Sequence, residues 1–144
     1  MKILIVGCGR LGSYLALSFS REGHSVTVVD VDKEALASLG PDFQGETVVG
    51  KGIDEEVLRR ARIEEADVFI AATGYDNTNI MASYVAKEIF KIKNVITRLD
   101  DPKKAEIFRS LGLNVISPTI LAAEGIRKCV EGLLCTSLSS AEEK

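Results

Sequence analysis

The chain has 144 residues, of which 46% are hydrophobic and 27% charged, a composition typical of one soluble globular domain. Its net charge of −3 argues against a nucleic-acid-binding protein, and no apolar stretch reaches the roughly 20 residues that span a bilayer. The start lacks the features of a signal peptide, and three scattered cysteines (Cys8, Cys129 and Cys135) fit reduced thiols, so we expect a cytoplasmic protein.

Short apolar runs alternate along the chain with segments whose apolar residues recur every three or four positions, which predicts strands alternating with helices. In chain order we expect strand Lys2–Val6, helix Arg10–Glu22, strand Ser25–Asp30, helix Asp32–Leu39, strand Glu46–Val49, helix Asp54–Ala61, strand Asp67–Ala72, helix Asn77–Phe90, strand Asn94–Arg98, a helix with Pro102 in its first turn that ends at Gly112, strand Asn114–Ile116, and a last helix from Pro118 to about Leu134.

This alternation predicts an α/β fold of Rossmann type, in which a parallel sheet is covered by helices on both faces. Right-handed crossovers favour the doubly wound strand order 3-2-1-4-5-6. We expect a single nucleotide-binding domain over residues 1–135, which includes the last helix, and a flexible tail over residues 136–144.

A glycine motif, Gly7-x-Gly9-x-x-Gly12, follows the first strand and opens the first helix. In this context the first glycine permits a tight turn, the second lets a pyrophosphate approach the backbone, and the third lets helix and strand pack closely. The helix N-terminus supplies N–H groups and a partial positive charge for the anion. The predicted phosphate-binding turn therefore comprises Gly7, Cys8, Gly9, Arg10, Leu11 and Gly12.

Two charged residues extend this site. Asp30 closes the second strand about twenty residues after the turn, where a carboxylate accepts hydrogen bonds from both ribose hydroxyls and repels a 2′-phosphate, which disfavours NADP. Asp30 is alternatively a cap for the next helix, although Asp32 is better placed for that role. Arg10 is either a phosphate ligand through its planar guanidinium or a solvated surface residue.

Other candidate residues follow the carboxyl ends of the third, fourth and fifth strands. They are the loop Lys51-Gly52, which has room for an adenine, the dipeptide Thr73-Gly74, and Arg98. Each is an ordinary loop feature alone, but ligands of such sheets bind at the carboxyl ends of the strands. We therefore expect all three to line one crevice with the glycine turn.

Catalytic groups are missing from this crevice. The single histidine, His24, lies in the turn after the first helix, at the opposite end of the sheet, and neither a Tyr-x-x-x-Lys pair, a P-loop nor a metal-ligand spacing is present. Too few residues remain for a second, substrate-binding domain. We predict binding without a catalytic residue or metal, with a small NAD-dependent oxidoreductase, or the cofactor half of a split one, as the alternative.

Several stretches together carry a family resemblance: VGCGRLGSYLA, Val28–Asp30, Glu64–Ser83, Ile96-Thr97-Arg98 with Asp101-Pro102, and Ile107–Pro118. The chain resembles the RCK domain, also called TrkA-N or KTN, over nearly its whole length. The resemblance implies a cytosolic regulatory subunit of potassium channels or of Trk/Ktr-type potassium uptake systems. Such domains bind NAD(H), ATP or ADP, and exchange of the ligand changes the geometry of a dimer or ring beneath the membrane pore.

Carried onto matching positions, the resemblance implies nucleotide contacts at the glycine turn, Asp30, Lys51-Gly52, Thr73-Gly74 and Arg98. Many members have an aspartate where this chain has Lys51, a difference that bears on nucleotide preference. Many also continue into a smaller C-terminal ligand-binding domain. The resemblance leaves open whether NAD(H) or ATP/ADP is bound, and whether the effector is a potassium transporter or a transporter of another ion.

The apolar faces of the segments Asn77–Phe90 and Ala105–Leu111 exceed what one side of a sheet needs. We therefore expect part of them in a homodimer interface, with the helix Ile120–Leu134 crossing toward the partner. A nucleotide that binds one arrangement of subunits better shifts the population toward it. The expected partners are a second copy of the chain and a membrane potassium channel or transporter, which would hold the chain at the inner face of the membrane.

Overall fold

The centre of the structure, a computed structural model that describes residues 1–142 and their side chains as far as residue 134, is a parallel β-sheet. Within these residues six strands pair in the order β3-β2-β1-β4-β5-β6. The strands are β1 (Lys2–Val6), β2 (Ser25–Asp30), β3 (Glu46–Val49), β4 (Val68–Ala71), β5 (Asn94–Arg98) and β6 (Asn114–Ile116). Because every neighbouring pair is parallel, the carboxyl ends share one edge, and the predicted fold and strand order are confirmed.

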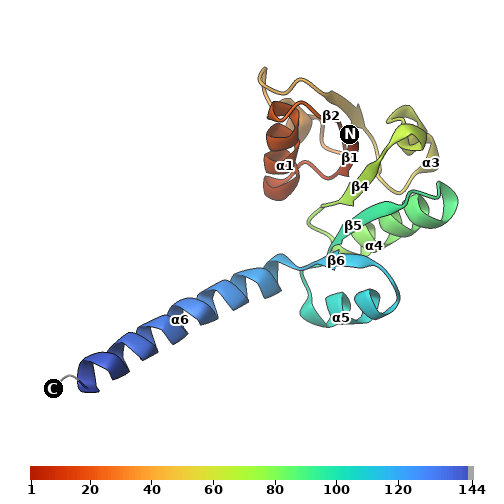
Figure 1. Ribbon diagram of the computed structural model, residues 1–144. Helices are drawn as coiled ribbons and strands as arrows, with labels where there is room; N and C mark the ends of the chain where they lie inside the picture. The colour runs from red at the N-terminus through yellow and green to blue at the C-terminus, as the bar shows by residue number, and fades with distance from the viewer. Residues whose placement is uncertain (143–144) are drawn as a thin grey trace.

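Helices connect the strands and cover the sheet (Figure 1). They are α1 (Arg10–Arg21), α2 (Lys33–Ala37), α3 (Glu55–Arg60), α4 (Asp76–Tyr84), α5 (Pro102–Ser110) and α6 (Pro118–Glu142), with a 3-10 turn η1 (Ile63–Glu65) and a π-helical segment η2 (Val85–Ile89). Caps mark several of their starts, because Asp32, Asp54 and Asp101 each accept a hydrogen bond from the backbone N–H two residues later.

Strand β1 shows why the strands read as continuous apolar runs. Successive side chains of a strand point to opposite faces, and those of Ile3 and Ile5 pack with α1 and α2, whereas Leu4 and Val6 pack with α3 and α4. All four side chains are buried, so β1 is covered on both faces and has no polar alternation. The glycine turn that follows β1 therefore starts from a fixed position in the middle of the sheet.

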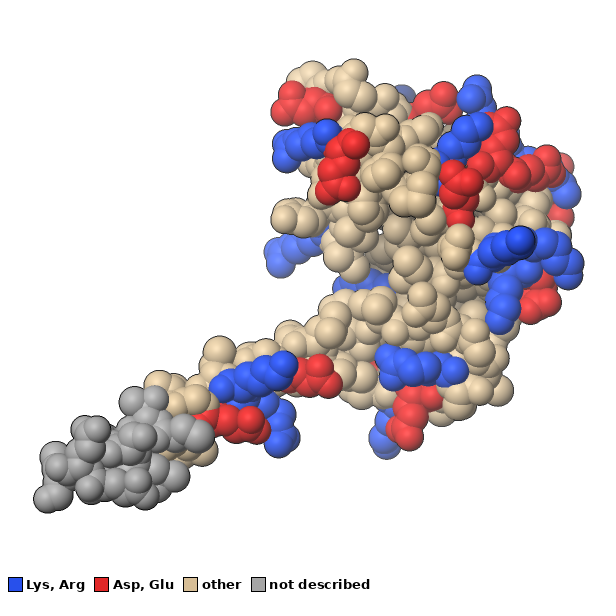
Figure 2. Space-filling view, in the orientation of Figure 1, with Lys and Arg blue, Asp and Glu red and all other residues tan. Residues whose placement is uncertain are grey.

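The last helix, α6, extends away from the sheet (Figure 1). Ile120 packs with the small cluster of α5 and β6, but every side chain from Leu121 to Leu134 is exposed. Figure 2 shows that charged and uncharged side chains share the surface of this helix, and that basic and acidic groups are interspersed over the visible face of the molecule. Among residues 1–142, no helix is both long enough and apolar enough to cross a membrane.

Two helix predictions differ from the structure. We expected the last helix to end near Leu134, but its backbone stays helical to Glu142, because residues 133–142 contain no proline or glycine that would stop it. Glu143 and Lys144 lie outside the described residues, and the flexible tail over 136–144 stays a prediction. The helix expected over Asn77–Phe90 changes to π geometry at Val85, where the Phe90 N–H donates to the Val85 carbonyl over 3.2 Å.

Candidate nucleotide-binding site

A cavity of about 190 Å³ lies at the carboxyl edge of the sheet. It is lined by Val6, Gly7, Gly9, Val29, Asp30, Val31, Gly50, Gly52, Thr73, Gly74 and Tyr75. These residues come from the ends of β1, β2 and β4 and from the loop after β3. Because β1 has β2 on one side and β4 on the other, the cavity lies at the point where the strand order reverses, which is where doubly wound sheets bind ligands.

The glycine turn has its shape because side chains do not fit at two of its positions. Gly7 has a φ of +107°, and a Cβ atom there would lie 2.7 Å from the Thr73 nitrogen. A Cβ atom on Gly12 would overlap the Gly7 carbonyl oxygen, so α1 and the turn pack backbone against backbone. At Gly9 a Cβ atom would meet nothing within 4 Å, which leaves open space over the start of α1.

That start of α1 is suited to an anion. Its N-cap is Gly9, and no side chain caps the first turn. The first N–H groups of a helix have no partner within the helix and carry a partial positive charge. The open space above Gly9 therefore faces backbone donors of the kind that bind phosphate groups.

The Asp30 carboxylate is fixed at the rim of the cavity by two backbone groups. Its Oδ2 accepts a hydrogen bond from the Cys8 N–H over 2.7 Å, and its Oδ1 accepts one from the Asp32 N–H over 2.8 Å. Each carboxylate oxygen has a further lone pair, so Asp30 can still accept hydrogen bonds from a vicinal diol. Asp32, not Asp30, caps α2, since its side chain accepts from the Glu34 N–H over 2.9 Å.

Cys8 lies in the turn, but its side chain is buried away from the cavity. The thiol donates a hydrogen bond to the Ala35 carbonyl over 3.3 Å and packs between the sheet and α2. Burial, with a smaller contribution from the nearby negative charge of Asp30, raises the pKa of the Cys8 thiol to about 11. The thiol is therefore protonated at neutral pH and belongs to the core of the protein.

Half of the predicted site residues line the cavity. They are Gly7, Gly9, Asp30, Gly52, Thr73 and Gly74. Of the others, Cys8 and Gly12 are buried, Leu11 packs against the core on the α1 side, and Arg10 and Lys51 are exposed. The sixth, Arg98, forms a bidentate ion pair with Asp100, with Nε–Oδ1 and Nη2–Oδ2 distances of 2.9 and 3.2 Å. A ligand role stays a prediction for all twelve residues, those that line the cavity and those that do not.

The sequence analysis missed several residues that line the cavity. Val31 and Tyr75 are exposed apolar side chains next to predicted site residues, and Val6, Val29 and Gly50 belong to or directly follow strand ends. Their position in the sequence could have identified them, because the last residues of adjacent parallel strands and the residues that follow them reach the same edge of the sheet. From Gly74 and Tyr75 an open depression of about 530 Å³ continues over Asp76, Asp100 and Lys104.

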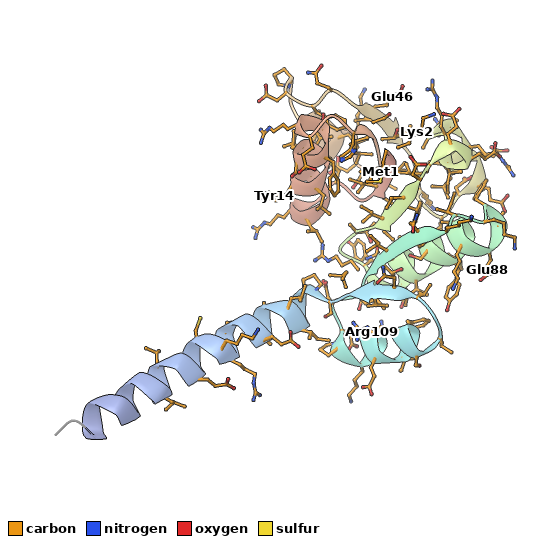
Figure 3. The ribbon with its side chains drawn as sticks, in the orientation of Figure 1. Met1, Lys2, Tyr14, Glu46, Glu88 and Arg109 are labelled. Atoms are coloured by element: carbon orange, nitrogen blue, oxygen red, sulfur yellow. The ribbon has the colours of Figure 1, made fainter. Side chains whose placement is uncertain are left out.

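A second, smaller cavity of about 80 Å³ lies at the amino edge of the sheet, where Figure 3 labels Lys2 and Glu46. Two ion pairs join residues of its lining, Lys2 to Glu65 over 3.2 Å and Arg62 to Glu46 over 3.8 Å. Among the residues that the structure describes, the lining of this cavity contains no glycine turn and none of the predicted site residues. The carboxyl edge is therefore the candidate ligand site.

The sequence model of the TrkA-N domain family matches residues 3–129 of this chain. The chain belongs to the TrkA-N domain family. This finding confirms the resemblance that the glycine turn, the Glu64–Ser83 stretch and the Ile107–Pro118 stretch indicated.

Curated relatives of this TrkA-N domain carry names from potassium transport. The Trk system potassium uptake protein TrkA of Streptomyces coelicolor is 44% identical over 117 residues, which are 81% of this chain and 52% of the relative. A TrkA homolog of Methanothermobacter thermautotrophicus is 34% identical over 90% of this chain and 60% of its own length. The chain thus spans about half the length of these relatives, and both are named for potassium uptake and not for an enzyme activity.

Solved structures share the fold of this TrkA-N domain. The TrkA-N domain of the Escherichia coli inner membrane protein ybaL has a TM-score of 0.79 at 19% identity and covers 89% of this chain and 95% of its own. Shewanella denitrificans Kef CTD in its AMP-bound form also has a TM-score of 0.79, at 18% identity over 93% of this chain and 82% of its own. The GsuK channel bound to NAD has a TM-score of 0.66 at 22% identity, over 81% of this chain and 21% of its own.

Proposed function

We propose that this TrkA-N domain is the cytoplasmic, nucleotide-binding regulatory part of a potassium uptake system, and that it catalyses no reaction. The observation that carries the proposal is the Asp30 carboxylate, fixed by the N–H groups of Cys8 and Asp32 beside an uncapped helix start. This arrangement suits a ribose diol next to a phosphate. The names of the relatives support potassium as the transported ion.

The proposed ligand is an adenine nucleotide, NAD(H) or ATP/ADP. Structural neighbours whose titles name AMP and NAD support this class. NADP is disfavoured, because its 2′-phosphate would lie against the Asp30 carboxylate. The apolar lining, in which Val31 is exposed and Val6 and Val29 are buried beneath the surface, suits an adenine ring.

The absence of catalysis is inferred from the groups that line the cavity. Among the described residues, its ionisable side chains are Asp30 and Tyr75. Asp30 is bonded to two backbone N–H groups and Tyr75 is 76% exposed, so neither is placed to transfer a proton in a closed site. The proposed function is therefore binding of a nucleotide without a reaction on it.

We further propose that the chain acts as a homodimer or larger ring, in contact with a membrane potassium channel or transporter subunit at the inner face of the membrane. Exposed apolar side chains on three helices support self-association. They are Met81 on α4, Ile107 on α5, and Leu121, Ile126, Val130, Leu133 and Leu134 on α6. Helices of a folded domain that expose so many large apolar groups are typical of interaction surfaces.

A thermal-shift panel tests the nucleotide site. We expect NAD, NADH, ATP or ADP, at about one hundred times its Kd, to raise the Tm of the parent by about 10 °C, and NADPH to have little effect. Asp30→Ala should lose this shift. The matched control is Asp32→Ala, which removes a neighbouring carboxylate outside the cavity and should lower the basal Tm while keeping the shift. Equal shifts for parent and Asp30→Ala would contradict the proposed site.

A further inference from the structure

The loop Thr73–Tyr75 forms the β4 side of the cavity, and all three of its residues line it. The loop is also in contact with the phosphate turn, since a Cβ atom on Gly7 would lie only 2.7 Å from the Thr73 nitrogen. Gly74, in the middle of the loop, has no side chain that could fix its conformation. The shape of this wall is therefore set by the hydrogen bonds of the residues on either side of Gly74.

The side chain of Asn79, on the first turns of α4, makes that connection. It is 0% exposed. Its Oδ1 accepts hydrogen bonds from the Thr73 N–H over 2.9 Å and from the Thr73 hydroxyl over 2.6 Å. Its Nδ2 donates to the Thr73 carbonyl over 3.0 Å and to the Arg98 carbonyl over 2.9 Å. The amide thus uses both of its hydrogens and both acceptor positions of its oxygen.

Three of these four hydrogen bonds go to one residue. Asn79 holds the N–H, the carbonyl and the hydroxyl of Thr73, which fixes the direction of the backbone as it enters Gly74. The Thr73 hydroxyl in turn accepts a hydrogen bond from the Tyr75 N–H over 3.2 Å. One buried amide therefore holds Thr73, the residue from which this wall of the cavity starts and to which Tyr75 is bonded.

The same helix start also holds the loop after β5. The Asp76 carboxylate accepts hydrogen bonds from the Asp100 N–H over 2.9 Å and from the Asp101 N–H over 3.0 Å. With the bond from Asn79 to the Arg98 carbonyl, α4 ties the carboxyl ends of β4 and β5 together. A displacement of the cavity wall is then resisted by both strands.

We propose that Asn79 is a positioning residue of the nucleotide site. Its side chain holds Thr73 and Gly74 in the conformation that receives the ligand, but Asn79 itself does not contact the ligand. This inference rests on the proposed nucleotide binding. It assigns a function in the site to a side chain that is buried in the fold and lies outside the cavity lining.

If Asn79 only stabilised the fold, its substitution should affect the protein in the same way as substitution of Ser83. Ser83 is therefore the matched control. Ser83 lies on the same helix and is also 0% exposed. It accepts a hydrogen bond of 2.7 Å from the Thr97 hydroxyl, so it too joins α4 to β5. Within the described part of the chain, the Ser83 side chain makes no hydrogen bond to the loop Thr73–Tyr75, and it does not line the cavity. Its loss should weaken the fold and leave the site intact.

The test compares Asn79→Asp with Ser83→Ala by titration calorimetry, with NAD or ADP, whichever the parent binds. At pH 8 a carboxylate at position 79 would present an oxygen to the carbonyl oxygens of Thr73 and Arg98. We expect the Kd to rise at least about tenfold relative to the parent, as two buried hydrogen bonds become repulsive contacts. Ser83→Ala should bind within about twofold of the parent while its urea midpoint falls.

The pH dependence of Asn79→Asp separates positioning from stability. Burial favours the neutral form of a carboxyl group, and the neutral acid again donates one hydrogen bond. The ratio of its Kd to that of the parent, measured at each pH, should therefore decrease as the pH is lowered from 8 to 5. The parent measured at the same pH accounts for titration of Asp30, Asp76 and Asp100 and of the nucleotide.

If Asn79→Asp does not fold, variants of Thr73, whose hydroxyl bonds to Asn79, provide the test. Thr73→Val, which removes the hydroxyl that bonds to Asn79, should weaken binding, and Thr73→Ser, which keeps it, should restore most of the affinity. Equal changes in Kd for Asn79→Asp and Ser83→Ala, a pH-independent Kd ratio, or equal binding by the two Thr73 variants would overturn the inference. A parent that binds none of the nucleotides would instead refute the proposed function on which the inference rests.

Discussion

At the scale of single residues, Asp30 connects the fold to the site. Its carboxylate accepts hydrogen bonds from the backbone of the glycine turn and from the backbone that follows β2. The residue that we expect to bind the ribose therefore also fixes the distance between β2 and the phosphate turn. This double role explains why a variant at Asp30 needs a neighbouring carboxylate, Asp32, as its control.

The glycines of the turn should respond differently to the same substitution. Gly12→Ala places a Cβ atom against the Gly7 carbonyl oxygen, and we expect the free energy of unfolding to fall by about 3 kcal/mol. Gly9→Ala adds a methyl group to open space, so its free energy of unfolding should change by less than about 1 kcal/mol while nucleotide binding weakens. Urea denaturation and calorimetry check the two effects, and equal stability of the two variants would contradict the packing argument.

Cys8 should make the stability of the protein depend on alkaline pH. The folded protein holds the thiol proton to about pH 11, whereas a thiol of ordinary pKa, 9.0, loses it earlier in the unfolded chain. Stability from this group is therefore complete below pH 9 and is lost as the pH rises toward 11. In urea titrations over this window, the decrease should be smaller for Cys8→Ala than for the parent. Cys129→Ala, at an exposed thiol, should behave like the parent.

At the scale of elements, α4 and the segment η2 that continues it differ in function and in backbone geometry. The first turns of α4 carry Asp76 and Asn79, whose side chains hold the loops after β5 and β4, and its end continues as the π-helical segment Val85–Ile89. Apolar spacing predicted a single helix here, because a repeat every four residues does not show whether a backbone N–H bonds to the fourth or the fifth residue before it. The hydrogen-bond pattern is decided by packing.

For helix α5, local sequence signals were sufficient to predict where the helix begins. Pro102 is in its first turn, and Asp101 is its N-cap, with a 2.9 Å hydrogen bond from the Lys103 N–H. We expect Asp101→Ala to lower the free energy of unfolding by about 1 kcal/mol, and Asp101→Asn to recover most of it, since asparagine caps equally well. A urea midpoint for Asp101→Asn as low as that of the alanine variant would show that the cap is not the cause.

At the scale of the whole molecule, α6 is the part that one copy of the chain leaves unpacked. Figure 1 shows it projecting from the sheet, and its side chains from Leu121 to Leu134 are exposed. Large apolar groups on a helix are stabilised only when another surface covers them. The proposed homodimer or ring would provide such a surface.

Self-association should therefore depend on the apolar residues of α6. Ile126 is 65% exposed, so Ile126→Glu should leave the stability of the single domain within about 0.5 kcal/mol. It should, however, shift sedimentation-equilibrium profiles toward the monomer. Lys128→Glu, a charge change at an exposed position on the same helix, is the matched control and should keep the assembly. A parent chain that is monomeric at high concentration would contradict the proposed assembly.

The sequence by itself determined the six strands, their order and the glycine turn, because buried parallel strands are continuous apolar runs and a turn of this shape requires glycine at fixed positions. It also predicted that Asp30, Gly52, Thr73 and Gly74 share one crevice, and all four line the same cavity. Only the tertiary structure decided which neighbours complete the site. Arg98 pairs with Asp100 in the next loop, and Asn79 is bonded to Thr73 and the end of β5. These contacts join segments that meet only when the sheet brings two strand ends together, so helical spacing alone could not predict them.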